Sequence, residues 1–125
     1  MASMKVFFFL LFFVPSAFLA RDPVAEWLVP KTHDFGDIPQ GKPVDYFFKF
    51  KNISDEPFVI DNIRTTCGCT APDWSEAPIE SDSISSIKIT FDARKTGYFR
   101  KKIRVFFSSQ RKVEMLSIEG YVLEP

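Results

Sequence analysis

The two cysteines of the chain, Cys67 and Cys69, flank Gly68 in the segment RTTCGCTAP, and the chain has no third thiol. Residues i and i+2 of an extended or turned segment have Cα atoms about 5.5 to 7 Å apart, which just reaches the range that a disulfide tolerates. Gly68 gives the backbone freedom to bend. The spacing therefore predicts a strained, labile Cys67–Cys69 disulfide whose very small loop limits its stabilising effect.

Three other interpretations of the pair stay open. Two buried reduced thiols would behave as small hydrophobic residues, although cysteines that flank a glycine lie on the same side of an extended strand. A redox-active dithiol is the second, yet the spacing is not Cys-x-x-Cys and no helix N-terminus is apparent that would favour a thiolate. The third is a soft metal site for Cu(I), with Cys67, Cys69 and His33 as its ligands. His33 is the only histidine of the chain. Zinc fits less well because it prefers four ligands.

Residues 1–20 have the layout of an export signal. A lone Lys5 precedes an uninterrupted apolar run over 6–14, and small residues lead to the charged pair Arg21-Asp22. The run is shorter than the roughly 20 residues that cross a bilayer core, which favours a cleaved signal peptide over a membrane anchor. We therefore expect an exported protein, periplasmic or secreted, without stable membrane insertion after cleavage. Such a compartment is oxidising and favours a disulfide.

Composition and charge limit the remaining chain to one small domain. Removal of residues 1–20 from the 125-residue chain leaves 105 residues, enough for a single hydrophobic core. Lys5 is the only charge in the leader, so the mature chain carries 15 Lys and Arg against 16 Asp and Glu, a net charge of −1. This balance gives no indication of nucleic-acid or anionic-membrane binding. We assign residues 21–30 to a lead-in and residues 31–125 to the folded domain.

Hydrophobic side chains alternate with a period of two after the leader, which is the pattern of half-buried strands. The alternation slips near Asp61-Asn62, where we expect a bulge, and Gly120 indicates a close backbone approach. Residues 71–83 are rich in Pro, Ser and acids and indicate a long connection between sheet edges. The pattern predicts an all-β, antiparallel, immunoglobulin-like β-sandwich of about seven strands. The expected strands cover about residues 44–51, 58–65 as the returning strand, 86–91, 99–107 and 113–123, with a broken first strand over 27–35.

Three aromatic residues are candidates for a partner-binding surface. Trp74 follows the cysteines in the expected connection, whereas Phe47 and Phe106 stand opposite the main apolar set of their strands. Exposed aromatic side chains at such positions are typical of protein contacts. The competing interpretation is that all three are core residues of a second face.

The charged residues do not indicate catalysis. The acids occur in turns and edge segments without a base, a nucleophile and an orienting group that recur together, so we predict no enzyme and no cofactor. Basic residues of the strand over 99–107 are interpreted as a solvated sheet edge that charge protects against pairing with another sheet. These basic residues are Arg100, Lys101, Lys102 and Arg104.

The order of several motifs resembles the bacterial DUF1573 family over about residues 31–122. The resemblance implies an exported immunoglobulin-like sandwich, similar to those of the ASH and major sperm protein group, and no established activity. Its most specific part is the CGCT element together with the aromatic strand upstream. The motifs are HDFGDI (33–38), Gly41, YFFKFKN (46–52), TCGCT (66–70), Phe91-Asp92 and Lys95-Thr96-Gly97.

Together these features predict a non-catalytic binding or structural module of the bacterial cell envelope, with an envelope protein as its partner. The alternative is a thiol-based redox or copper-handling protein that acts through Cys67 and Cys69. A sandwich supports many roles, so the choice depends on the absence of a catalytic pattern and on analogy of fold.

Overall fold

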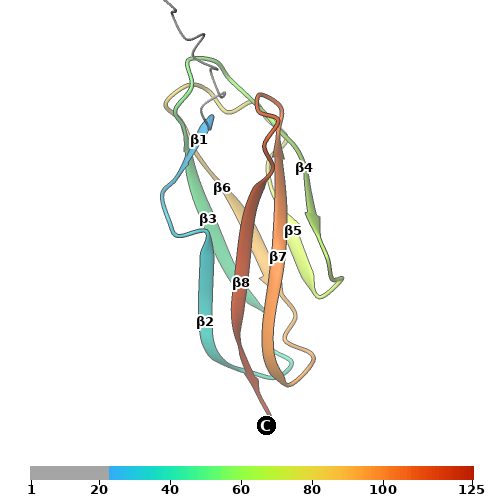
Figure 1. Ribbon diagram of the computed structural model, residues 1–125. Helices are drawn as coiled ribbons and strands as arrows, with labels where there is room; N and C mark the ends of the chain where they lie inside the picture. The colour runs from blue at the N-terminus through green and yellow to red at the C-terminus, as the bar shows by residue number, and fades with distance from the viewer. Residues whose placement is uncertain (1–22) are drawn as a thin grey trace, which may run out of the picture.

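The computed structural model describes residues 23–125, and the predicted signal peptide over residues 1–20 lies outside this range. Within it the chain forms two four-stranded β-sheets that pack face to face, and no helix long enough to cross a membrane (Figure 1). The predicted all-β immunoglobulin-like sandwich is confirmed, with eight strands in place of about seven. The strands are β1 (Ala25–Trp27), β2 (Thr32–Pro39), β3 (Val44–Asn52), β4 (Ile60–Thr65), β5 (Thr70–Asp73), β6 (Ile84–Phe91), β7 (Gly97–Phe107) and β8 (Glu114–Leu123).

The first sheet has the strand order β1-β3-β6-β5, and the second has the order β2-β8-β7-β4. Neighbouring strands are antiparallel except β2 and β8, which run parallel. The expectation of a fully antiparallel fold is therefore wrong at this edge. Its cause is the break around Pro30: the chain leaves β1 in one sheet and enters β2 in the other, beside the last strand and in the same direction.

Two segments pair differently from the sequence prediction. The segment 58–65 does not return along β3; its β4 part lies at the edge of the second sheet and pairs with β7. The bulge expected at Asp61-Asn62 is confirmed by a register shift between Ile60 and Asn62. The connection expected over 71–83 begins later, because the chain first forms β5 at the edge of the first sheet.

The core lies between the inward rows of the two sheets. Every second residue of a strand faces the same side, and the aromatic strand β3 buries Phe48 and Phe50 completely. Burial of one large apolar side chain contributes roughly 1.5 to 3 kcal/mol relative to its exposure. The hydrophobic side chains with 0% exposure on the long strands are Phe48, Phe50, Ile87, Ile89, Ile103, Val105, Leu116, Ile118 and Val122.

β7 is an inner strand with β8 on one side and β4 on the other. The interpretation of its basic residues as a charged sheet edge, protected against pairing with another sheet, is therefore wrong. Arg100, Lys102 and Arg104 are exposed on the outer face of the sheet, whereas Lys101 lies on the inward row between Phe99 and Ile103. One cation of the stripe is thus directed between the two sheets.

A buried carboxylate, Glu114, ties the first described residues to β8. Its side chain is 4% exposed and pairs with the Lys31 amine at 2.7 Å. Gln110 donates to the same carboxylate at 3.2 Å and accepts the Val24 backbone N–H at 3.1 Å. Burial raises the pKa of Glu114, but the hydrogen bonds from Lys31 and Gln110 and the Lys31 charge outweigh it, so this pKa lies below its usual value.

The sandwich consequently begins earlier than residue 31, which was the start predicted from the sequence. β1 pairs with β3, and Val24 and Ala25 are buried in the core. The segment assigned as a lead-in over 21–30 is, from Val24 onward, part of the fold.

We expect Lys31→Met to lower the free energy of unfolding by about 1 to 2 kcal/mol near pH 7, because a buried carboxylate loses its half-exposed cation. The folded pKa of Glu114 lies below the unfolded value of 4.5. The stabilisation is therefore fully present above that pH and is lost as pH falls through the folded pKa. Urea unfolding near pH 7 and near pH 3 measures it, with Lys112→Met as the exposed control. An equal loss at both pH values would contradict this role.

At Gly120, β8 passes close to Gly36 of β2 and Phe99 of β7. A Cβ there would lie 2.8 Å from the Gly36 carbonyl oxygen and 2.9 Å from Cζ of Phe99, which confirms the expected close approach. We expect Gly120→Ala to lower the free energy of unfolding by about 1 to 3 kcal/mol. Gly68→Ala is the matched control, since no atom lies within 4 Å of a Cβ at that position. Thermal or urea unfolding that gives the same loss for both variants would refute the steric explanation.

Candidate functional site

The Cys67–Cys69 pair forms a disulfide, with its Cα atoms 5.2 Å apart, as the spacing and the expected compartment predict. The disulfide spans the turn that carries the chain from β4 in the second sheet to β5 in the first (Figure 1). β5 begins at Thr70, directly after the second cysteine. The disulfide therefore lies where the chain changes sheets, on the flank formed by two edge strands.

Hydrogen bonds hold this turn together. The Cys69 N–H donates to Cys67 Sγ at 3.2 Å, and the Thr70 N–H donates to the Cys67 carbonyl at 3.3 Å. The Thr65 hydroxyl donates to the same carbonyl at 3.1 Å. Gly68, which was expected to let the turn bend, has a φ outside the left-handed range, and no atom lies within 4 Å of a Cβ placed on it. The observed backbone therefore does not require glycine there.

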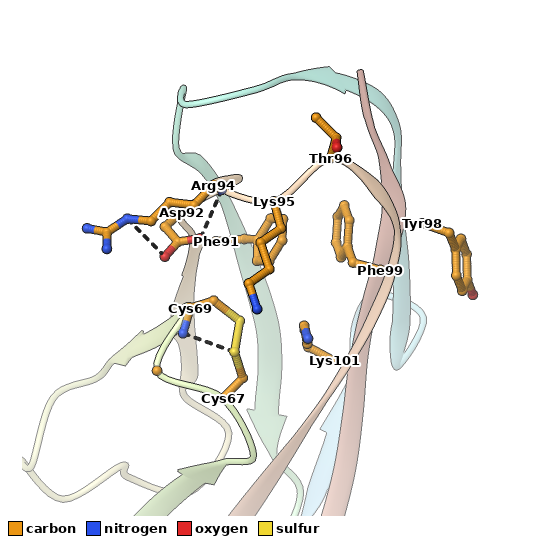
Figure 2. Close-up of a pocket in the computed structure, with 11 residues that line it drawn as sticks. Cys67, Cys69, Phe91, Asp92, Arg94, Lys95, Thr96, Tyr98, Phe99 and Lys101 are labelled. Atoms are coloured by element: carbon orange, nitrogen blue, oxygen red, sulfur yellow. Dashed lines mark hydrogen bonds and ion pairs between the residues drawn. A yellow bond between two sulfur atoms is a disulfide. The ribbon is translucent and has the colours of Figure 1, made fainter. Parts of the chain in front are cut away.

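A pocket of about 570 Å³ adjoins the disulfide. Three segments line it: the cysteine turn, the turn between β6 and β7, and the first residues of β7 (Figure 2). The Asp92 N–H donates to the Cys69 carbonyl at 3.0 Å and so fixes the two turns to each other. Phe91 and Phe99, whose ring centroids are 4.0 Å apart, stack where the pocket meets the core. The volume lies within the range of small-ligand pockets.

The pocket is cationic. Arg94, Lys95 and Lys101 line it together with one carboxylate, Asp92, which gives the lining a net charge of +2. Arg94 Nε lies 3.5 Å from the Asp92 carboxylate, so that this acid is already paired. Figure 2 shows the Lys95 side chain extending toward the disulfide and Lys101 on the strand across the pocket. Within residues 23–125, no carboxylate lies within 4.0 Å of either lysine amine.

Lys101 is the residue that departs from the pattern of its strand. Its neighbours on the inward row, Phe99 and Ile103, are buried. A lysine in such a row is tolerated where its amine reaches water or an anion, because an unpaired buried charge is costly. The pocket provides that outlet, since Lys101 lines it.

Sequence reasoning missed the cationic pocket. The unusual position of Lys101 was visible in the sequence, because this lysine belongs to the apolar set of its alternating strand. The residue was nevertheless interpreted only as part of a basic stripe. Nothing in the local sequence indicated that Arg94 and Lys95 line a pocket. They join the pocket because the turn between β6 and β7 folds against the cysteine turn, a contact between segments distant in sequence.

His33 lies away from the cysteines. Its ring stacks on Tyr46 with centroids 3.6 Å apart and meets Phe35 edge-on at 4.7 Å; it does not line the pocket. Burial lowers the pKa of His33, and the nearby charge of Asp34 opposes the shift without reversing it. The alternative metal set is not assembled, because the two sulfurs are bonded to each other. In the described part of the chain, no group of three or more His, Cys, Asp or Glu is arranged to hold a metal ion.

The three aromatic candidates do not form one surface. Phe47 is 48% exposed on the outer face of the first sheet. Phe106 lies on the outer face of the second sheet, where the Arg64 guanidinium is 5.7 Å from its ring centroid. Trp74 is partly buried and packs against the core. Each aromatic residue would therefore have to act separately.

The sequence profile of the family described as "Protein of unknown function (DUF1573)" matches residues 28–122. The chain belongs to the DUF1573 family. This confirms the resemblance that the CGCT element and the aromatic strand indicated. No curated protein matches the chain.

Solved structures share the fold at low sequence identity. A protein of unknown function from Porphyromonas gingivalis W83 has a TM-score of 0.67 and 12% identity, over 79% of this chain and 46% of that one. The ASH / PapD-like domain 7 of human CEP192 has a TM-score of 0.65 and 13% identity, over 82% and 87%. The VesB protease of Vibrio cholerae has a TM-score of 0.66 and 11% identity, over 79% and 32%. This chain thus spans less than half of the two bacterial proteins, and the likeness establishes the fold.

The disulfide gives a direct chemical prediction. We expect the chain, purified without reductant and alkylated under denaturing conditions, to take up no alkyl group, and to take up two after reduction, because both thiols are bonded. Intact mass spectrometry measures the uptake. Cys67→Ser serves as the control and should take up one group without reduction. Uptake of two groups by the unreduced chain would contradict the bond.

Proposed function

We propose that the protein is an exported, non-catalytic binding module of the bacterial cell envelope, and that its partner is an envelope protein that places an acidic group in the pocket beside the disulfide. The observation that carries this proposal is the pair of pocket amines, Lys95 and Lys101, which have no carboxylate within 4.0 Å among residues 23–125. An amine held in a partly enclosed site gains from a carboxylate that completes its hydrogen bonds.

An exposed aromatic residue next to the pocket supports a protein partner in particular. Tyr98 belongs to the pocket lining and is 66% exposed; its ring lies on the outer face of β7, directed away from the two amines (Figure 2), and its hydroxyl donates to Glu119 at 3.2 Å. A tyrosine of this exposure gives a large apolar contact with a polar tip, the kind of residue enriched at protein interfaces. Charge complementary to the two amines in the pocket would direct the approach of the partner and fix its orientation.

Export is supported by the sequence of residues 1–20, whose charge, apolar run and small residues match a secretory leader. The disulfide agrees with that route, because such bonds persist in oxidising compartments. Crosslinking in cells tests the envelope role and the partner together.

The test uses the full-length chain in cells that make it, with a photo-crosslinking residue at Thr96, which is exposed in the pocket lining. We expect a discrete crosslinked adduct with an envelope protein in the envelope fraction, and its loss in the Lys95→Glu/Lys101→Glu variant, since the charges would then repel the acidic group. Immunoblotting after fractionation measures the adduct.

Two matched controls separate this contact from incidental ones. The same crosslinker at Arg111, exposed at the other end of the sandwich, should give no adduct. Lys51→Glu/Lys112→Glu makes the same change in net charge far from the pocket and should leave the Thr96 adduct unchanged. An adduct that survives reversal of the pocket charges would show that this pocket is not the binding site.

A further inference from the structure

We propose that the Cys67–Cys69 disulfide is chemically active: it exchanges with small anionic thiols that enter the cationic pocket, and Lys95 and Lys101 select these thiols by their charge. This inference goes beyond the binding role, since contact with a protein partner requires no change at the sulfurs. It depends on three independent features of the site, namely access to the sulfurs, a donor for the leaving thiolate, and the charge of the pocket.

Both cysteines border the pocket, and Cys69 also packs against the core. Cys67 and Cys69 line it and are partly exposed, and Gly68 between them is exposed. A structural disulfide is commonly enclosed by the core, whereas exposed disulfides are the ones that exchange readily. The volume of about 570 Å³ beside the bond is large enough for a thiol of the size of a small peptide.

The turn provides a donor for one of the two sulfurs. The Cys69 N–H already points to Cys67 Sγ at 3.2 Å. A thiolate accepts such a hydrogen bond more strongly than a disulfide sulfur does, because it carries a full negative charge. Cys69 Sγ, in contrast, has among the described residues 23–125 only the Thr70 hydroxyl, at 3.8 Å. Cys67 is therefore the better leaving group, and Cys69 is the sulfur that an entering thiolate attacks.

The exchange balances without any further reactant. An entering thiolate forms a bond to Cys69 Sγ; the Cys67–Cys69 bond breaks, and its electron pair stays on Cys67 as a thiolate. A second thiolate then attacks the sulfur of the first thiol, which releases Cys69 as a thiolate and forms a disulfide between the two small thiols. Two small thiolates are thus oxidised, and the protein disulfide is reduced to two thiolates.

The two lysines favour this reaction in two ways. Their charges attract an anionic thiol into the pocket, and a cationic environment stabilises the thiolates that form beside them. Neither amine has a carboxylate within 4.0 Å in residues 23–125. A thiol with a positive charge should be excluded by the same field.

The experiment compares the reduction rates of the disulfide by glutathione, an anionic thiol, and by cysteamine, a cationic one, at the same thiolate concentration. Acid quenching followed by mass spectrometry measures mixed disulfide and dithiol in the intact oxidised protein. The reference is an oxidised peptide, RTTCGCTAP, which has the same sequence around the bond without the pocket. We expect the ratio of the glutathione rate to the cysteamine rate to be about tenfold higher in the protein than in the peptide.

Variants assign the preference to the pocket. Lys95→Gln/Lys101→Gln should lower the ratio to that of the peptide, and Lys51→Gln/Lys112→Gln, with an equal change in net charge at the other end of the sandwich, should not. If the double variant fails to fold, the single variant Lys95→Gln still tests the prediction, because Lys95 is exposed. It should lower the ratio of the glutathione rate to the cysteamine rate in part. A ratio equal to that of the peptide, or a disulfide that neither thiol reduces in the folded protein, would overturn the proposal.

Discussion

Hydrophobic contact between the inward row of β3 and β6 and that of β7 and β8 holds the two sheets together. Each sheet alone would expose one apolar face to water, so neither is stable without the other. The strongest evidence is the set of side chains with no exposure, which come from all four of these strands. Every other feature of the molecule is placed by this contact, including the edges at which the chain passes from one sheet to the other.

The cysteine turn is one of these passages. It joins β4, at the edge of the second sheet, to β5, at the edge of the first, and the turn between β6 and β7 closes on it through the hydrogen bond from Asp92 to Cys69. The loop that the disulfide closes contains three residues, so it constrains the unfolded chain little. Its importance is local, because it fixes two sulfurs at the wall of a pocket rather than cross-linking distant parts of the fold.

Lys101 connects the packing of the core to the chemistry of that pocket. An inward lysine interrupts a row that otherwise reads Phe, Ile, Val and Phe on β7, and departures from a consistent pattern are where function is most often found. The interruption lies where the pocket opens between the sheets, so the amine reaches solvent instead of the core. The proposed binding of an acidic partner and the proposed exchange with an anionic thiol both depend on the Lys101 amine in the pocket. They differ because only the exchange breaks the Cys67–Cys69 disulfide.

Local patterns in the sequence were enough to predict the fold class, the course of the long strands, the bulge in β4 and the close approach at Gly120, because each follows from alternation along one strand or from the size of one side chain. It also indicated the disulfide, since two residues so near in sequence cannot lie far apart. The strand partners, and the pocket that brings Lys95 and Lys101 to the cysteines, became evident only from the folded chain. The reason is that a period of two specifies which face a residue takes, whereas the choice of neighbouring strand, such as the parallel pair of β2 and β8, depends on where the chain crosses between the sheets.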